Sequence, residues 1–294
     1  MGKLEGRVAV VTGAGAGLGR AEALALAEQG ARVVVNDLAP SVADVADEIE
    51  AAGGKALHVS GDISERATAD AIIAAASEHF GGLDVLVNNA GVLRDRMLFN
   101  MSDEDWDLVL RVHLRGHFLL SRNAAALWRA RSKETGAPVK ASVINTASEA
   151  FLFGAAGQPN YAAAKAGIAA LTVATARSMS RYGVRANAIC PRARTGMTSD
   201  VFGPAPETGL DKLSVDHVAP FVAFLASDAA AKISGQVFVV HGGMVTLMAP
   251  PTVEKRFDAA GTLWSQEEMA SSIGGYFADR DPARVFAVSD LPAE

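Results

Sequence analysis

Three side chains in the middle of the chain have the types and spacing needed for proton transfer. Tyr161 and Lys165 stand four residues apart, which places them on one face of a helix. There the ammonium is expected to stabilise a phenolate and to lower the pKa of Tyr161 from about 10 toward neutrality. Ser148, at the end of a predicted strand, would hydrogen-bond a substrate oxygen. An isolated Tyr-x-x-x-Lys pair is common on helices, so these residues predict oxidation of a secondary alcohol, or its reverse, only with a cofactor site.

A glycine-rich turn, TGAGAGLG at residues 12–19, follows the first predicted strand and opens a predicted helix. Glycine lets the backbone turn tightly, lets a pyrophosphate approach and aims the amides of the helix start at it. The spacing is G-x-x-x-G-x-G rather than G-x-G-x-x-G, so the strand–turn–helix context carries the prediction of dinucleotide binding. The residues assigned to the cofactor here are Gly13, Gly17, Leu18 and Gly19.

Asp37 ends the second predicted strand and is the expected partner of the adenosine ribose. Its carboxylate would accept hydrogen bonds from both ribose hydroxyls and repel a 2′-phosphate. No Arg or Lys directly follows it, and Arg20, the one local cation, lies inside the helix start, so NAD is favoured over NADP. The alternative is an aspartate that starts a loop and accepts hydrogen bonds from nearby backbone amides.

Composition excludes several other classes of protein. The 294 residues are 50% apolar and 20% charged, with a net charge of -6, so neither disorder nor a nucleic-acid partner is expected. The single cysteine, Cys190, excludes an intrachain disulfide and a multi-cysteine metal cluster, and no metal site is expected. No signal peptide, membrane span or peroxisomal C-terminal signal is recognised, so the cytoplasm is the expected location.

Strands and helices are predicted to alternate along the chain. The expected strands are residues 7–11, 32–36, 56–60, 84–88, 142–146, 184–190 and 236–240, and helices are expected at residues 18–29, 42–52, 67–79, 103–129 and 160–181. Because the strands are apolar on both faces, helices should cover both sides of a parallel sheet. The predicted fold class is α/β, a Rossmann-like doubly wound parallel sheet of about seven strands with a C-terminal extension.

The chain is predicted to form one dinucleotide-binding and catalytic domain over residues 1–247. A Pro-Pro break then precedes residues 248–294, in which a helix is expected at 265–277. This extension is too short for a core of its own and is expected to pack on the domain or on a partner subunit.

Four elements in order resemble the short-chain dehydrogenase/reductase family: the glycine-rich turn, the segment NNAG at 88–91, Ser148 and the YAAAK segment at 161–165. The resemblance covers residues 6 to about 243. It implies that Asp62 and Ile63 lie at the adenine, that Asn89, Ala90 and Gly91 lie beside the cofactor, that Thr195 lies near the nicotinamide amide, and that Tyr161 and Lys165 also contact the cofactor. It further implies an enzyme that assembles as a homodimer or homotetramer.

Two positions depart from the family pattern. His113, in VHLRG, stands where most members have a catalytic Asn that helps a helix bend and supports a water connecting the lysine to solvent. A histidine there would keep that role or add its own titration; equally, it would be a satisfied buried side chain. After the sixth predicted strand, the usual Pro-Gly becomes PRART at residues 191–195, which introduces Arg192 and Arg194. Arg192 is a candidate for meeting an anionic substrate group, with ordinary surface pairing as the alternative.

Within the family the chain resembles the (3R)-hydroxyacyl-CoA dehydrogenase module of peroxisomal multifunctional enzymes and bacterial relatives that act on steroid side-chain thioesters. The segments that carry this resemblance are VHLRG, NDL at 36–38, RDRM at 94–97 and GQPNY at 157–161. It implies oxidation of a 3-hydroxyacyl-CoA thioester to the 3-oxoacyl-CoA in beta-oxidation of a fatty acid or steroid side chain. The alternatives are a 3-oxoacyl-acyl-carrier-protein reductase, a hydroxysteroid dehydrogenase and a non-catalytic dinucleotide-binding sensor.

Overall fold

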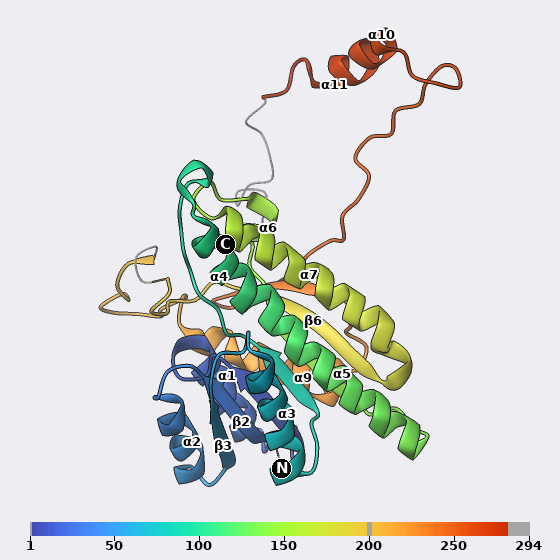
Figure 1. The fold of residues 1–294 in the computed structure, drawn as a ribbon. Coiled ribbons are helices and arrows are strands. Elements are labelled where there is room, and N and C mark those ends of the chain that lie inside the picture. Colours follow the sequence, from blue (N-terminus) through green and yellow to red (C-terminus); the bar gives the residue numbers. More distant parts are fainter. Residues whose placement is uncertain (1, 199–201, 282–294) are drawn as a thin grey trace. The chain divides into compact units, whose positions relative to one another are not determined.

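A single mixed sheet organises the first 247 residues in the computed structural model, which describes residues 2–198 and 202–281 (Figure 1). Its strand order is β3-β2-β1-β4-β5-β6-β7-β8, and all neighbours are parallel except β7 and β8. The strands are β1 (Val8–Thr12), β2 (Arg32–Asp37), β3 (Lys55–Ser60), β4 (Val85–Asn88), β5 (Ala141–Thr146), β6 (Val184–Pro191), β7 (Val237–His241) and β8 (Met244–Leu247). The predicted α/β doubly wound fold is confirmed.

Helices cover both faces of this sheet. One face carries α1 (Gly17–Glu28), α2 (Val42–Ala51) and α9 (Ala219–Ala226), and the other carries α3 (Arg66–Phe80), α5 (Gly116–Thr135) and α7 (Pro159–Met179). Figure 1 shows α5 and α7 running side by side. The described residues of this unit also form α4 (Asp103–Leu110), α6 (Ala150–Phe153), the π-helical turn η2 (Arg111–Arg115) and the 3-10 turns η1 (Leu98–Asn100), η3 (Ser180–Tyr182), η4 (Val215–His217) and η5 (Asp228–Ala230).

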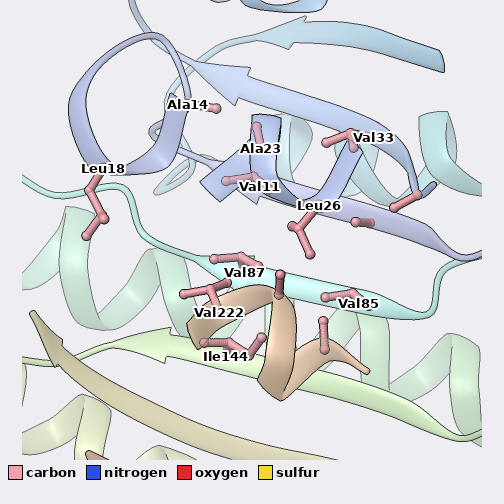
Figure 2. Close-up of a cluster of buried hydrophobic side chains, with 14 of the residues drawn as sticks. Val11, Ala14, Leu18, Ala23, Leu26, Val33, Val85, Val87, Ile144 and Val222 are labelled. Atoms are coloured by element: carbon pink, nitrogen blue, oxygen red, sulfur yellow. The ribbon is translucent and has the colours of Figure 1, made fainter. Parts of the chain in front are cut away.

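The core has two layers because successive strand residues point to opposite faces of the sheet. Val11, Val33 and Val87 pack toward α1 and α9, where Figure 2 shows them with Leu26 and Val222. Their sequence neighbours Val10, Val34 and Leu86 pack toward α3 and α5, and all of these side chains are fully buried. Burial on both faces explains why the strands read as continuous apolar runs.

Three local features differ from the sequence prediction. An eighth strand, β8, returns antiparallel to β7, with His241 opposite Met244 across a two-residue Gly-Gly turn. The predicted helix 103–129 is α4 and α5, joined through the π-helical turn η2. The predicted helix 265–277 is likewise α10 (Gln266–Met269), the π-helical turn η6 (Ala270–Gly274) and α11 (Gly275–Phe277).

The chain separates into two compact units, Met1–Leu247 and Met248–Glu294. In the second unit, Ser265 begins α10 with a capping box: its hydroxyl accepts from the Glu268 amide at 3.1 Å, and the Glu268 carboxylate accepts from the Ser265 amide at 2.9 Å. The predicted packing of residues 248–294 on the domain or a partner remains a prediction. Among the described residues, no helix is long and apolar enough to cross a bilayer.

Candidate active site

A cavity of about 720 Å³ lies where the carboxyl ends of the parallel strands meet. It spans the point between β1 and β4 where the strand order reverses, which is where open α/β sheets bind ligands. Its volume is within the usual range for small-molecule sites. The residues predicted for catalysis and for cofactor binding all line this one cavity: Gly13, Gly17, Leu18, Gly19, Asp37, Asp62, Ile63, Asn89, Ala90, Gly91, His113, Ser148, Tyr161, Lys165 and Thr195.

The glycine-rich turn is packed too closely for larger residues. A Cβ on Gly19 would lie 2.2 Å from the Gly13 carbonyl oxygen, and a Cβ on Gly13 would lie 2.7 Å from the Ala90 Cα. Gly13 and Gly17 also have positive φ angles of 67° and 54°, which side chains oppose. The glycine-rich turn therefore forms a cradle, and the surface that it presents to the cavity is made of backbone atoms.

The start of α1 offers amides to an anion. Ala16, its N-cap residue, provides no side-chain cap, and the first turn contains no acidic residue. Uncapped amides and the helix dipole favour a negative charge at this end. The cradle and its donors therefore fit a pyrophosphate.

Asp37 accepts hydrogen bonds from nearby backbone amides, as expected for an aspartate that starts a loop, and it also lines the cavity. Its Oδ2 accepts from the Gly15 amide and its Oδ1 accepts from the Ala39 amide, both at 2.9 Å. Each carboxylate oxygen has a further lone pair, so both remain able to accept from ribose hydroxyls. The residues present thus fit a dinucleotide.

The remaining predicted cofactor residues are held by local hydrogen bonds. Asn89 ties β4 to β1, because its side chain donates to the Thr12 carbonyl at 3.1 Å and its amide donates to the Thr12 hydroxyl at 3.1 Å. Asp62 accepts from the Ser64 amide at 2.8 Å, next to the buried Ile63. The Thr195 hydroxyl accepts from the Met197 amide at 3.2 Å. These contacts fix the walls of the cavity.

Asn160 anchors the helix that carries the tyrosine and lysine. This fully buried side chain donates to the Arg94 and Asp105 carbonyls at 3.0 and 3.2 Å and accepts from the Tyr161 amide at 2.8 Å. Pro159 at the first helical position removes an amide that would lack a partner. Asn160 was not predicted as a site residue, although a polar side chain between Pro159 and Tyr161 was a signal for this role.

Burial dominates the ionisation of the tyrosine–lysine pair. It raises the pKa of Tyr161 to about 12, against the lowering effect of the neighbouring Ser148 hydroxyl. Burial also lowers the pKa of Lys165 to about 7. Its Nζ donates to the Thr146 carbonyl at 2.6 Å and lies 5.3 Å from the centre of the Tyr161 ring. The expected lowering of the Tyr161 pKa toward neutrality by Lys165 is not found, because burial disfavours the charged forms of both groups.

His113 is buried in the π-helical turn and supports the wall beside Tyr161. Its Nε2 lies 2.8 Å from the Val92 carbonyl oxygen and 3.1 Å from the Val92 nitrogen. The ring meets the Tyr161 ring edge-on, with centres 5.2 Å apart, and occupies the space of a Cβ on Gly91. Burial and the nearby Lys165 hold the pKa of His113 well below its usual range. The His113 ring, hydrogen-bonded to Val92, is therefore neutral and does not change its protonation near neutral pH.

The two arginines after β6 are engaged by carboxylates. Arg192 donates from Nε and Nη2 to the two oxygens of Glu149, both at 2.7 Å. Arg194 pairs with Asp211 at 3.2 Å and donates to the carbonyls of Phe202 and Gly203. This is the pairing alternative, in which the Glu149 carboxylate meets the charge of Arg192.

Apolar side chains that sequence reasoning did not select complete the cavity. Val92, Leu108, Val112 and Met197 line it. Leu108 and Val112 are spaced by four, as expected for one face of a helix, but that spacing alone does not distinguish a cavity wall from a core.

Comparison with known proteins identifies the family. The model of the short chain dehydrogenase family matches residues 7–203. The chain is 60% identical to hydroxyacyl-CoA dehydrogenase ChsB1 of Mycobacterium tuberculosis, over 98% of this chain and 94% of that protein. It is 39% identical to mouse peroxisomal multifunctional enzyme type 2, over 83% of this chain but only 32% of that larger protein. A solved short chain dehydrogenase from Mycobacterium avium shares 42% identity and a TM-score of 0.87, over 98% of this chain and 100% of that one.

The glycine cradle and the tyrosine–lysine pair on one cavity define a dinucleotide-dependent oxidoreductase. The chain belongs to the short chain dehydrogenase family and, as its dehydrogenase relatives imply, uses a nicotinamide dinucleotide. The family resemblance stated from the sequence is confirmed.

Proposed function

We propose that this protein oxidises a (3R)-hydroxyacyl-CoA thioester to the 3-oxoacyl-CoA with NAD, as a step of beta-oxidation. The observation that carries the proposal is the single cavity that joins Asp37 at one part to Ser148, Tyr161 and Lys165 at another. The 60% identical relative is named a hydroxyacyl-CoA dehydrogenase, which supports the substrate class. The apolar wall of Val92, Leu108 and Val112 suits an acyl chain or a steroid side chain.

The dinucleotide supplies a hydride acceptor whose oxidised ring carries a positive charge. The glycine turn and the amides of α1 would hold its pyrophosphate, and Asp37 would hold its ribose. We assign NAD rather than NADP because the Asp37 carboxylate would repel a 2′-phosphate.

Tyr161 is the proposed group that takes the proton from the substrate hydroxyl. Ser148 would donate a hydrogen bond to the same oxygen and orient the alcohol, and the Lys165 ammonium would stabilise the phenolate. Because burial raises the pKa of Tyr161 to about 12, positive charge in the cavity is needed before the phenolate forms near neutral pH.

A panel assay tests the substrate class and cofactor together. Purified protein is mixed with NAD or NADP and with (3R)- and (3S)-hydroxyacyl-CoA esters of increasing length, including steroid side-chain thioesters, and NADH or NADPH absorbance is followed. We expect turnover with NAD on the 3R series. Activity confined to ring alcohols would favour a hydroxysteroid dehydrogenase, a preference for NADPH and carrier-protein esters would favour the reductase, and NAD binding without turnover would favour a sensor.

The Tyr161→Phe variant tests the proton-transfer assignment. It should bind NAD as the wild type does and lose about two to four orders of magnitude in kcat. The matched control is Tyr182→Phe, which changes a tyrosine outside the cavity. Near-normal turnover of Tyr161→Phe would refute the assignment.

The homodimer or homotetramer expected from the family remains a proposal. Sedimentation velocity at several concentrations would distinguish these assemblies from a monomer. Location in the cytoplasm is likewise a proposal, which fractionation of the source cells would test.

A further inference from the structure

An ion pair between Arg192 and Glu149 joins two segments of the site that are far apart in the sequence. Arg192 directly follows β6, and Glu149 directly follows Ser148. The guanidinium donates from Nε and Nη2 to the two oxygens of the Glu149 carboxylate, both at 2.7 Å. Two parallel hydrogen bonds of this kind fix the relative orientation of the two groups as well as their distance. The mechanism proposed above gives neither residue a role.

The ion pair adjoins the cavity without forming its wall. Ser148, which precedes Glu149, lines the cavity, and so do Pro191 and Ala193 on either side of Arg192. In the described structure the side chains of Arg192 and Glu149 are not among those that line it. The pair would therefore act on a bound substrate through its chain neighbours.

The backbone at Arg192 is fixed by the sheet. Its amide donates to the Val240 carbonyl at 3.0 Å, and Pro191 stands opposite Val240 in the ladder between β6 and β7. The strand β6 itself lies inside the sheet, between β5 and β7. The guanidinium of Arg192 thus extends from a firmly held part of the fold.

Ser148, in contrast, stands where the chain leaves the sheet. The Ala147 amide still donates to the Ile189 carbonyl of β6 at 2.7 Å, but the chain then enters α6, a four-residue helix in which no residue is fully buried. The Ser148 hydroxyl accepts from the Ala150 amide at 3.2 Å. Its direction therefore depends on how firmly this turn is held, and packing of α6 restrains the turn less than the sheet restrains β6.

The ion pair is enclosed enough to supply this restraint. The side chains of Arg192 and Glu149 are 23% and 13% exposed, whereas those of the surface pair Arg20 and Glu48 are 43% and 44% exposed. Water and salt screen a partly enclosed pair less than an exposed one. Charge-assisted bidentate hydrogen bonds are also about twice as strong as neutral ones.

We propose that Arg192 is a positioning residue for Ser148: its two hydrogen bonds with Glu149 link the turn that begins at Ser148 to β6 and so direct the Ser148 hydroxyl toward the substrate oxygen. The inference rests on the proposed function, in which Ser148 orients the alcohol. Arg192 itself does not touch the reacting atoms in this arrangement.

Hydrogen exchange tests the link without a substrate. Mass spectrometry follows exchange in peptides that cover residues 147–154, in which the Ala150 and Phe151 amides donate to Ser148. Arg192→Gln should speed exchange in this segment at least about threefold, because the turn opens more often when two charge-assisted hydrogen bonds are lost. A smaller change would overturn the proposal.

A double-mutant cycle with Ser148 tests the consequence for the reaction. On an alcohol that the enzyme oxidises, Arg192→Gln should lower kcat about tenfold, keep KM within about threefold and leave the affinity for NADH unchanged. In a Ser148→Ala background the same change should alter kcat less than about twofold, because the hydroxyl that Arg192 positions is absent. An equal loss of kcat in both backgrounds would overturn the proposal. A raised KM with unchanged kcat would also overturn it and would indicate that Arg192 contacts the substrate.

Arg7→Gln is the matched control. Arg7 is 18% exposed and pairs with Asp228 at 2.6 Å, but it precedes β1, whereas the cavity lies at the carboxyl ends of the strands. This variant should keep kcat within about twofold of the wild type and leave exchange in residues 147–154 unchanged. Equal effects of Arg7→Gln and Arg192→Gln would show that any lost ion pair loosens the protein, which would overturn the proposal.

A second variant and the choice of substrate keep the result decisive. If circular dichroism shows that Arg192→Gln has not folded, Glu149→Gln removes the charge at nearly constant volume and should change exchange and kcat in the same direction. If another alcohol is oxidised in place of hydroxyacyl-CoA thioesters, the proposed substrate is wrong and the cycle is measured on that alcohol. If no alcohol is oxidised, the proposed function fails, and exchange in the free protein still decides whether Arg192 holds the turn at Ser148.

Discussion

Replacing Glu22 should make the fold more stable, and more so as the pH rises. Glu22 lies three residues after Gly19 on the buried side of α1, among Leu18, Ala23 and Leu26. The side chain is 0% exposed, and neither carboxylate oxygen has a hydrogen-bond partner among the described residues. Burial alone raises the pKa of Glu22 from 4.5 to about 8. The carboxyl is therefore protonated in the folded protein at neutral pH.

The sign and size of the effect follow from linkage. Between pH 4.5 and about 8 the unfolded chain releases the Glu22 proton while the folded chain keeps it, so rising pH favours unfolding. In this window the free energy of unfolding falls by about 1.4 kcal/mol per pH unit. The total loss of stability across the window is on the order of 5 kcal/mol. Glu22→Gln keeps the volume and removes the ionisation. The difference in unfolding free energy between variant and wild type should be small near pH 4.5 and grow until about pH 8.

Urea unfolding followed by circular dichroism at pH 5, 6, 7 and 8, at one protein concentration, measures this difference. The buried His113, His117 and Lys165 also make stability depend on pH, but in both proteins alike, so the difference isolates Glu22. Glu48→Gln, at an exposed residue paired with Arg20, is the control and should stay within about 1 kcal/mol at every pH. A pH-independent difference for Glu22→Gln would refute the reasoning.

Three further predictions concern the cavity. Asp37→Ala should weaken NADH binding by roughly tenfold to a hundredfold, because two charge-assisted hydrogen bonds are lost, and should improve the affinity for NADPH relative to NADH. Fluorescence titration measures both affinities, and an unchanged preference would contradict the cofactor assignment. Gly19→Ala should lower dinucleotide affinity at least about tenfold, because its Cβ would lie 2.2 Å from the Gly13 carbonyl oxygen, whereas Gly243→Ala, with nothing within 4 Å, should not. His113→Asn should leave the pH profile of kcat unmoved between about pH 6 and 9, because the ring is already neutral; a moved limb would show that the imidazole titrates.

The sheet was predictable because its strands are buried on both faces, and a run such as VAVVT has no other simple reading. The β8 strand was harder, because its four residues alternate between half-buried and exposed positions at the sheet edge. The Gly242-Gly243 pair before it was a usable hairpin signal. The π-helical turn at His113 leaves no mark in hydrophobic spacing, so the long helix looked continuous.

Residues of the cavity were predictable from the sequence where their residue types and their spacing together indicate one kind of chemistry, as with Tyr161 and Lys165. What sequence reasoning did not give was the balance of burial against charge. The pKa of Tyr161 depends on how deeply the ring is enclosed, which is a property of the packed protein. The partner of Arg192 was hidden for the same reason: Glu149 is distant in sequence and meets Arg192 only in the fold.

These ionisation states have one consequence for catalysis. Around Lys165 the protein keeps Tyr161, His113 and His117 neutral by burial, while Arg192 and Arg194 are paired with carboxylates at the edge of the cavity. Charge that enters such a site is poorly screened, because few mobile or opposing charges surround it. The proton affinity of Tyr161 should therefore respond strongly to the charge of Lys165 and of the bound ligand, and weakly to added salt.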